Sequence, residues 1–95
     1  MRKVEYTERA QADIEDIFDW VAQQDGPTAI LVVDRIEETV LNVATFPQMG
    51  KVTTKQGVFL FGGSRKHPFR ITYRFSNERL TIVRVFRSNR RSVQY

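Results

Sequence analysis

Cysteine is absent from this sequence of 95 residues, and histidine and tryptophan each occur once. Without cysteine, the chain forms no disulfide-stapled scaffold, no thiolate metal site and no cysteine nucleophile. With His67 as its one histidine, a zinc site built from several histidines is excluded as well. We therefore expect no metal in this protein.

Long apolar runs and glycine-rich phosphate loops are also missing. No apolar run approaches the ~18 residues of a membrane helix, and the first residues carry charges where a signal peptide has its apolar segment. Gly62-Gly63-Ser64 lacks the spacing of a phosphate-binding loop and is expected to form a tight turn. No nucleophile-elbow motif surrounds a serine. These absences predict a cytoplasmic protein with no cofactor and no membrane segment.

The length and composition indicate one globular domain over residues 1–95. Apolar residues make up 41% of the chain and charged residues 27%, a balance that argues against disorder. A chain of this size has room for one sheet and one layer of helices.

The charge is distributed unevenly along the chain. Residues 1–61 hold six basic and ten acidic residues, a net charge of −4, whereas residues 62–95 hold nine basic residues and one acid, a net charge of +8. Eight of these nine cations are arginines, the side chain best suited to paired hydrogen bonds with phosphate or carboxylate. We expect these arginines to gather on one side of a small sheet and to face an anionic partner. A solvated face whose long side chains cover apolar neighbours is the alternative.

The apolar pattern of the first half predicts a strand followed by two helices. Residues 2–6 alternate like a strand, and Thr7 stands at the N-cap position of a helix expected to end near Gln24. Residues 25–27 mark a turn, and a second helix runs until Phe46-Pro47 stops it. Because the turn is short, the two helices are expected to form an antiparallel hairpin.

In the second half the period changes to that of strands. Strands are expected at residues 58–61, 69–75 and 80–86. In the last of them, Val83 and Val85 are assigned to one face and Leu80, Ile82 and Phe86 to the other. Apolar residues on both faces indicate a central strand. The predicted fold class is α+β, in the order β-α-α-β-β-β, with the helical hairpin packed on one face of a small antiparallel sheet. The basic tail, residues 87–95, has only a weak pattern.

Two features of the first helix have an ordinary structural explanation. Asp13, Asp16 and Asp19 have the spacing of a helix surface and are expected to be solvated. Trp20 is expected at the edge of the core between hairpin and sheet, with partial exposure as the alternative.

One basic cluster has the residue types for metal-free cleavage of RNA. Such cleavage needs a base for the 2′-hydroxyl, cations for the phosphorane and an acid for the leaving oxygen. Lys66 or His67 would be the base, Arg70 and Arg87 the stabilising cations, and His67 or Tyr95 the acid. His67 before Pro68 is equally explained as a turn residue, and Tyr95 as a frayed end or a packing plug.

Several segments follow one another in the order and spacing of a known family. They are a strand that runs into an N-capped helix, the body of that helix, a short helical Ile-Glu-Glu segment, a helix-exit motif, a central strand, and a last strand with a basic tail, at residues 4–10, 12–21, 36–38, 46–51, 68–74 and 83–91. In these segments the chain resembles the RelE/ParE superfamily of toxins from type II toxin–antitoxin systems, from about residue 2 to about residue 91.

The resemblance implies a helical hairpin on an antiparallel sheet and a cognate antitoxin that wraps the toxin, so that an oligomer with the antitoxin is expected. RelE-like members are enzymes that cut messenger RNA in the ribosomal A site, whereas ParE-like members bind and poison DNA gyrase. Residues 7–10 and 46–50 are closer to the ParE-like branch. We therefore expect a growth-arresting toxin of the plasmid-stabilisation kind that inhibits DNA gyrase. A ribosome-dependent mRNA endoribonuclease and an inactive member that only binds its antitoxin are the alternatives, so the resemblance leaves open whether the protein is an enzyme.

Some residues depart from the pattern of the ParE-like branch. Many relatives carry histidine where Arg87 stands and an acid where Arg91 stands, and Arg70 and Arg87 fall where RelE-like enzymes place phosphate-binding arginines. Tyr95 is near a functional tyrosine of those enzymes, with an offset of about one residue. The expected surface for target and antitoxin consists of Arg65, Lys66, Arg70, Arg74, Arg87, Arg90 and Arg91.

Overall fold

The structure is a computed structural model that describes residues 2–63 and 69–87 of the chain. The first half forms one strand and a pair of helices, and the second half forms a short 3-10 turn and four strands. In chain order these elements are β1 (Lys3–Tyr6), α1 (Glu8–Ala22), α2 (Gly26–Thr45), η1 (Pro47–Met49), β2 (Lys51–Val52), β3 (Phe59–Gly62), β4 (Phe69–Phe75) and β5 (Arg79–Arg87). The expected α+β order is confirmed, and two short elements were not expected, the 3-10 turn η1 and the two-residue strand β2.

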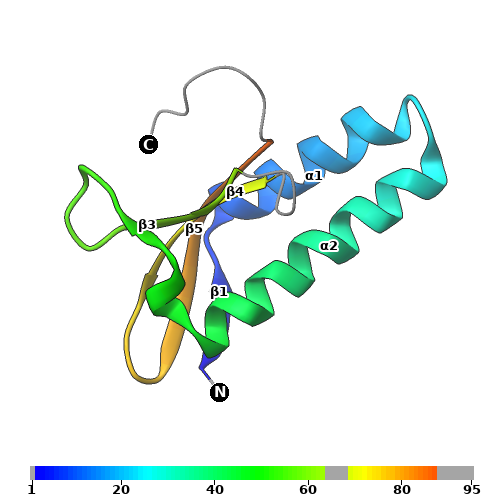
Figure 1. Cartoon of the computed structure of the whole chain (residues 1–95). Helices are drawn as coiled ribbons and strands as arrows, with labels where there is room; N and C mark the ends of the chain where they lie inside the picture. The colour runs from blue at the N-terminus through cyan, green and yellow to red at the C-terminus, as the bar shows by residue number, and fades with distance from the viewer. Residues whose placement is uncertain (1, 64–68, 88–95) are drawn as a thin grey trace.

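The two helices form the predicted antiparallel hairpin. The hydroxyl of Thr7 accepts a hydrogen bond of 3.0 Å from the backbone N–H of Ala10 and so caps α1, as expected. Helix α1 ends at Ala22, two residues before the expected Gln24. Helix α2 ends just before Phe46-Pro47, as predicted. Figure 1 shows that the far end of the hairpin projects beyond the sheet.

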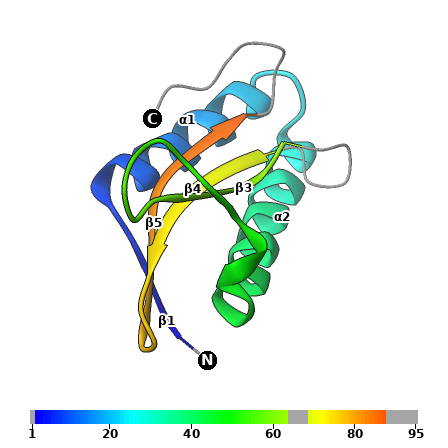
Figure 2. The same cartoon turned by 60° about the vertical axis from the view of Figure 1, so that its left-hand side comes forward.

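The strands form one sheet in the order β1-β5-β4-β3-β2. Strand β5 lies between β1 and β4, which confirms its prediction as a central strand. The pairs β4–β5, β3–β4 and β2–β3 are antiparallel, whereas β1 pairs with β5 in parallel, so the sheet is mixed. Figure 2 shows the curved sheet with the helices behind it.

The core lies between the helical hairpin and one face of the sheet. Strands β4 and β5 contribute five of its members, namely Ile71, Tyr73, Leu80, Ile82 and Val85. Helices α1 and α2 contribute Ile17, Ile36, Val40 and Val43, among others. Each fully buried aliphatic side chain contributes about 2 kcal/mol of transfer free energy, so this layer is the main source of stability.

A buried tyrosine joins the sheet to the end of the hairpin. The hydroxyl of Tyr73 donates a hydrogen bond of 2.6 Å to the carbonyl of Pro47. A Cβ atom at Gly50 would lie 2.1 Å from that hydroxyl oxygen, so only glycine fits there. The helix exit and β4 are thereby held against each other.

A β-bulge in β5 changes which residues face the core. Thr72 pairs with Arg84 but Tyr73 pairs with Ile82, so Val83 is an extra residue on β5. The bulge puts Val85 in the core together with Ile82. The prediction that Val83 and Val85 share one face and Ile82 the other is therefore wrong, because strict alternation does not continue through a bulge.

The connection between β2 and β3 lies on the face of the sheet away from the helices (Figure 1). It carries Val58, which is only 2% exposed, and its turn is closed by a hydrogen bond of 2.8 Å from the Thr53 hydroxyl to the Val58 carbonyl. The outer face of the sheet is therefore partly covered.

Candidate interaction surface

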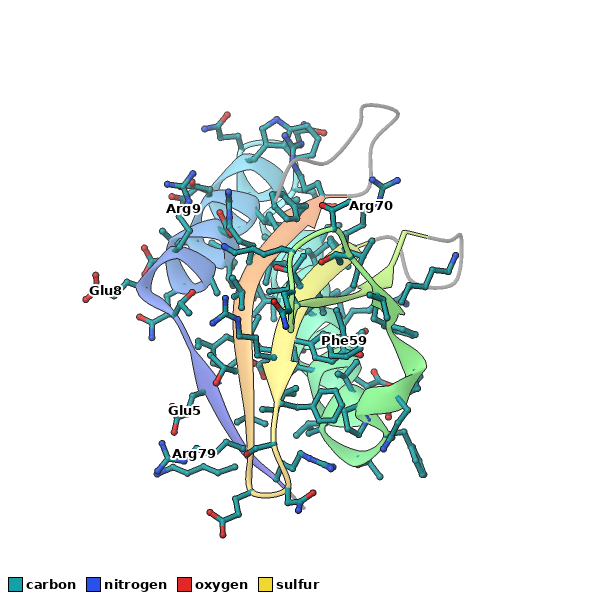
Figure 3. All side chains as sticks on the ribbon, turned by 90° about the vertical axis from the view of Figure 1, so that its left-hand side faces the viewer. Glu5, Glu8, Arg9, Phe59, Arg70 and Arg79 are labelled. Atoms are coloured by element: carbon teal, nitrogen blue, oxygen red, sulfur yellow. The ribbon has the colours of Figure 1, made fainter. Side chains whose placement is uncertain are left out.

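The five arginines described between residues 69 and 87 fall into two groups. Arg79 and Arg84 form ion pairs with acids of the first half of the chain. Arg70, Arg74 and Arg87 have no ion pair among the described residues. Figure 3 shows that Arg70 and Arg79 lie at opposite ends of the sheet. The arginines of the last third therefore do not form one continuous patch.

Asp13 makes the most extensive polar contact between helix and sheet. Its carboxylate accepts hydrogen bonds of 3.0 Å from Nε and from Nη2 of Arg84, and a third of 3.0 Å from the backbone N–H of Val85. The hydrogen bonds to Asp13 raise the pKa of the Arg84 guanidinium above its usual range, so Arg84 stays protonated. The expectation that Asp13 is solvated is wrong, since it is only 9% exposed.

Arg87 lies on the helix side of the sheet and contacts Trp20. The register Phe69↔Arg87 puts Arg87 on the face that carries Phe69, which packs against the core. Its guanidinium lies over the indole ring of Trp20, 3.9 Å from the ring centroid, a geometry typical of a cation–π contact. Trp20 is 47% exposed, so it lies at the edge of the core and more on the surface than expected.

Arg70 lines a groove formed by residues of η1, β2, β3 and the start of β4. The groove has a volume of about 520 Å³, and its described lining contains no acid: it consists of Met49, Lys51, Leu60, Phe61, Gly62, Gly63 and Arg70. Gly63 provides the room for the guanidinium, because a Cβ there would lie 2.8 Å from Nε of Arg70. Arg74 is exposed on the same strand.

The predicted surface is therefore only partly brought together. Arg70 and Arg74 project from alternate positions of β4 on the face away from the core, whereas Arg87 belongs to the opposite face. Six predicted residues lie outside the described part of the chain, namely Arg65, Lys66, His67, Arg90, Arg91 and Tyr95. The expectation that the arginines share one side of the sheet is wrong for Arg87.

Two residues of the surface were missed by the sequence reasoning. Lys51 adds a second cation to the groove of Arg70, and Trp20 provides the ring under Arg87. Trp20 follows Asp13 by seven residues, which is two helical turns, so both side chains lie on the same face of α1. That spacing was the available signal, but it does not reveal that β5 runs along this face.

The described residues show no sign of a metal site or a membrane segment. Within residues 2–63 and 69–87, no group of three or more histidine, cysteine, aspartate or glutamate side chains is placed to hold a metal ion. In the same part of the chain, no helix has the length and apolar character needed to cross a bilayer.

Comparison with solved structures relates this architecture to toxins. The structure described as "Chromosomal ParDE TA system from P. aeruginosa" matches with a TM-score of 0.79 and 25% sequence identity, over 94% of this chain and 98% of that chain. YafQ from E. coli strain BL21(DE3) matches with a TM-score of 0.49 and 14% identity, over 92% of this chain and 93% of that chain, a likeness too distant to bear on function. No curated protein sequence matches significantly. The fold is thus one found in a solved structure of a ParDE system.

A protein-family model matches almost the entire chain. The family model described as "ParE toxin of type II toxin-antitoxin system, parDE" matches residues 4–92. Because this match spans nearly the whole chain, the protein belongs to the ParE toxin family. This confirms the resemblance to the RelE/ParE superfamily. A toxin of a type II toxin–antitoxin system implies a cognate antitoxin as partner.

Proposed function

We propose that this protein arrests growth by binding and inhibiting DNA gyrase, and that its antitoxin neutralises it. The observation that carries the proposal is the ParE family match over residues 4–92. The likeness to the P. aeruginosa ParDE structure over 94% of the chain supports it. Inhibition of gyrase places the action of the toxin in the cytoplasm.

We propose that the arginines without an ion pair among the described residues contact the target and the antitoxin. Arg70 and Arg74 extend from the outer face of β4, and Arg87 ends β5. An exposed guanidinium without a carboxylate partner keeps its hydrogen-bond donors for an incoming anionic group. Arg65, Lys66, Arg90 and Arg91 belong to the same proposal by their place in the sequence.

The geometry favours binding over catalysis of RNA cleavage. An endoribonuclease of the expected kind would need Arg70 and Arg87 at the same phosphate. The register Arg70↔Phe86 and Phe69↔Arg87 puts these two side chains on opposite faces of the sheet. The cations that would stabilise one phosphorane therefore do not converge.

The test is a plasmid supercoiling assay with purified toxin and gyrase. We expect supercoiling to fall with toxin concentration, cleaved plasmid to accumulate, and added antitoxin to reverse both effects. Translation extracts should be unaffected. Cleaved ribosome-bound messenger RNA with normal supercoiling would instead identify an endoribonuclease, and unchanged growth on expression without antitoxin would identify an inactive antitoxin-binding member.

The roles of the cations are tested with matched arginine variants. Arg74→Gln removes an unpaired cation, whereas Arg79→Gln removes one that is already paired with Glu5. We expect Arg74→Gln to weaken inhibition several-fold and Arg79→Gln to change it by less than twofold. Equal effects of both variants would show that only net charge matters.

A further inference from the structure

Three arginines of the described chain lie over aromatic rings, and only one of them lacks a hydrogen-bond acceptor there. Arg2 lies over Phe75 and donates to the carbonyls of Ser76 and Ala44. Arg84 lies over Phe86 and donates to Asp13. Arg87 has no recorded acceptor among the described residues and lies over Trp20, at the shortest of the three distances, 3.9 Å. Within the described part of the chain, Arg87 is therefore oriented by a ring while its donors stay unused.

The short distance between the Arg87 guanidinium carbon and the centre of the Trp20 ring is that of a contact through the face of the guanidinium. A guanidinium that stacks on a ring uses its face for the contact, and its N–H groups point outward in the plane. A carboxylate can accept two of them at once, which is the strongest arrangement for such a pair. Because the ring limits the rotamers of Arg87, less side-chain entropy is lost when the anion binds.

Both members of the stack are held by the same junction. Asp13 lies about two turns before Trp20 on α1 and binds the side chain of Arg84 and the backbone of Val85, which lie three and two positions before Arg87 on β5. The helix and the strand are thereby fixed relative to each other within a few residues of the stack. Trp20 and Arg87 form a preorganised site, not a chance contact of two mobile side chains.

The surroundings select the kind of anion. Residues 14–22 of α1 contain Glu15, Asp16 and Asp19 and no basic residue, and these acids are exposed. They repel a nucleic acid, which carries a charge every few ångströms along its backbone. A single carboxylate on a protein segment meets much less of this repulsion than a row of phosphates, and an apolar neighbour in that segment can cover the exposed part of Trp20, which is 47% exposed.

We infer that Trp20 and Arg87 form a docking site for the cognate antitoxin, in which Arg87 binds a carboxylate and Trp20 both positions Arg87 and packs against an apolar side chain. The site takes an acidic and apolar segment of protein. The inference rests on the antitoxin partner that the family implies and not on the proposed gyrase target.

The experiment measures the affinity of the full-length toxin for its purified cognate antitoxin. We expect Trp20→Leu and Arg87→Gln each to weaken binding about tenfold. We expect the double variant to lose little more than either single variant, because each one already disrupts the stack. Trp20→Phe keeps a ring and should stay within about threefold of the wild type. Arg79→Gln, which removes an arginine at the other end of β5, should stay within twofold.

A second readout follows the stack itself. Trp20 is the only tryptophan of the chain, so its fluorescence reports on this site alone in a complex with an antitoxin that lacks tryptophan or carries it as a silent analogue. We expect a shift of its emission on addition of antitoxin and a different shift in Arg87→Lys, which keeps the charge but loses the planar group. A 20-base-pair DNA duplex should cause no saturable shift.

Several outcomes would overturn the inference. One is an unchanged affinity of folded Trp20→Leu, and another is a double variant whose loss equals the product of the two single losses. A saturable response to the DNA duplex that disappears in Arg87→Gln would assign the site to nucleic acid instead. If Trp20→Leu fails to fold, Arg87→Gln decides, and an affinity of that variant within twofold of the wild type overturns the inference. The supercoiling assay on the wild type decides the gyrase proposal separately.

Discussion

The two halves of β5 have different neighbours on the same edge. The first half, residues 79–82, pairs with β1 through backbone hydrogen bonds in a parallel register. The second half, residues 83–87, has side chains of α1 beside it: Thr7 at Val83, Asp13 at Val85 and Trp20 at Arg87. The backbone of β1 thus holds the first half of this edge of β5, and side chains of Thr7 and α1 hold the second half.

The difference shows at which positions the stability of the fold depends on a particular side chain. A backbone ladder forms with nearly any side chains, so β1 only has to be a strand of suitable pattern. The second half of the edge has backbone groups that no strand pairs with, and each one needs a particular side chain. Side-chain changes on α1 should therefore affect stability more than side-chain changes on β1.

The largest expected effect is that of Asp13→Ala. This change leaves the Arg84 guanidinium and the Val85 N–H without their acceptor, and loss of one partner of a largely buried pair is costly. We expect the free energy of unfolding to fall by about 3 kcal/mol in urea denaturation. Asp16→Ala, at an exposed position of the same helix, is the control and should stay within about 0.5 kcal/mol. Equal losses in Asp13→Ala and Asp16→Ala would show that the contacts of Asp13 with the second half of β5 add no stability.

Thr7→Ala should have the next largest effect. The Thr7 hydroxyl caps α1 at Ala10 and also donates a hydrogen bond of 2.8 Å to the carbonyl of Val83. We expect a loss of about 1–2 kcal/mol in the same assay. Thr45→Ala removes an exposed hydroxyl bonded only within its own helix, and it should cost less than about 0.5 kcal/mol. A loss at Thr7 no larger than that at Thr45 would show that the contact to β5 contributes nothing.

Alkaline pH tests the tyrosines on the two sides of β5. Burial, together with the charge of Glu37, raises the pKa of Tyr6 above 10.0, and burial raises that of Tyr73 despite a backbone hydrogen bond from Gly50. Both favour the protonated form in the folded state, so their contribution is fully present below pH 10 and is lost as the pH rises through the raised values. We expect stability to decline above pH 10, and to decline less steeply in Tyr73→Phe. A flat profile to pH 11.5 would contradict this.

The smallest effect is expected at the ion pair of the first half. Glu5 and Arg79 approach to 3.1 Å, as Figure 3 shows at the lower end of the sheet, but their side chains are 37% and 62% exposed. Solvent and salt screen such a pair, so Glu5→Ala should change stability by less than about 0.5 kcal/mol. This change in stability should vanish in 0.5 M NaCl. A loss of stability in Glu5→Ala near that of Asp13→Ala would show that side chains stabilise both halves of β5 equally.

The helices and most strands were predictable because their signals are local. Thr7 as a cap, the stop at Phe46-Pro47 and the alternation of β4 depend on neighbours within a few residues. Strand β2 was missed since two residues carry no period, and the bulge at Val83 was missed because it depends on the partner strand.

The interaction surface was less predictable than the fold. Arg79 and Arg84 were left out of the predicted surface, and they are the two of the five described arginines of β4 and β5 that form ion pairs. Arg87 was included, but its stacking on Trp20 and its place on the helix side depend on the register of β4 and β5. Charge counts give the sign of a region and carry no information on which face a side chain takes.

The sequence by itself determined the elements, their order and the excess of arginine in the last third, since these follow from local periodicity and composition. Only the tertiary structure decided that Asp13 is buried, that Trp20 lies under Arg87, and that the arginines divide between two faces. The physical reason is that these contacts join residues about 70 positions apart, and such pairs are formed by the register of a sheet and the docking of a helix, which no local pattern encodes.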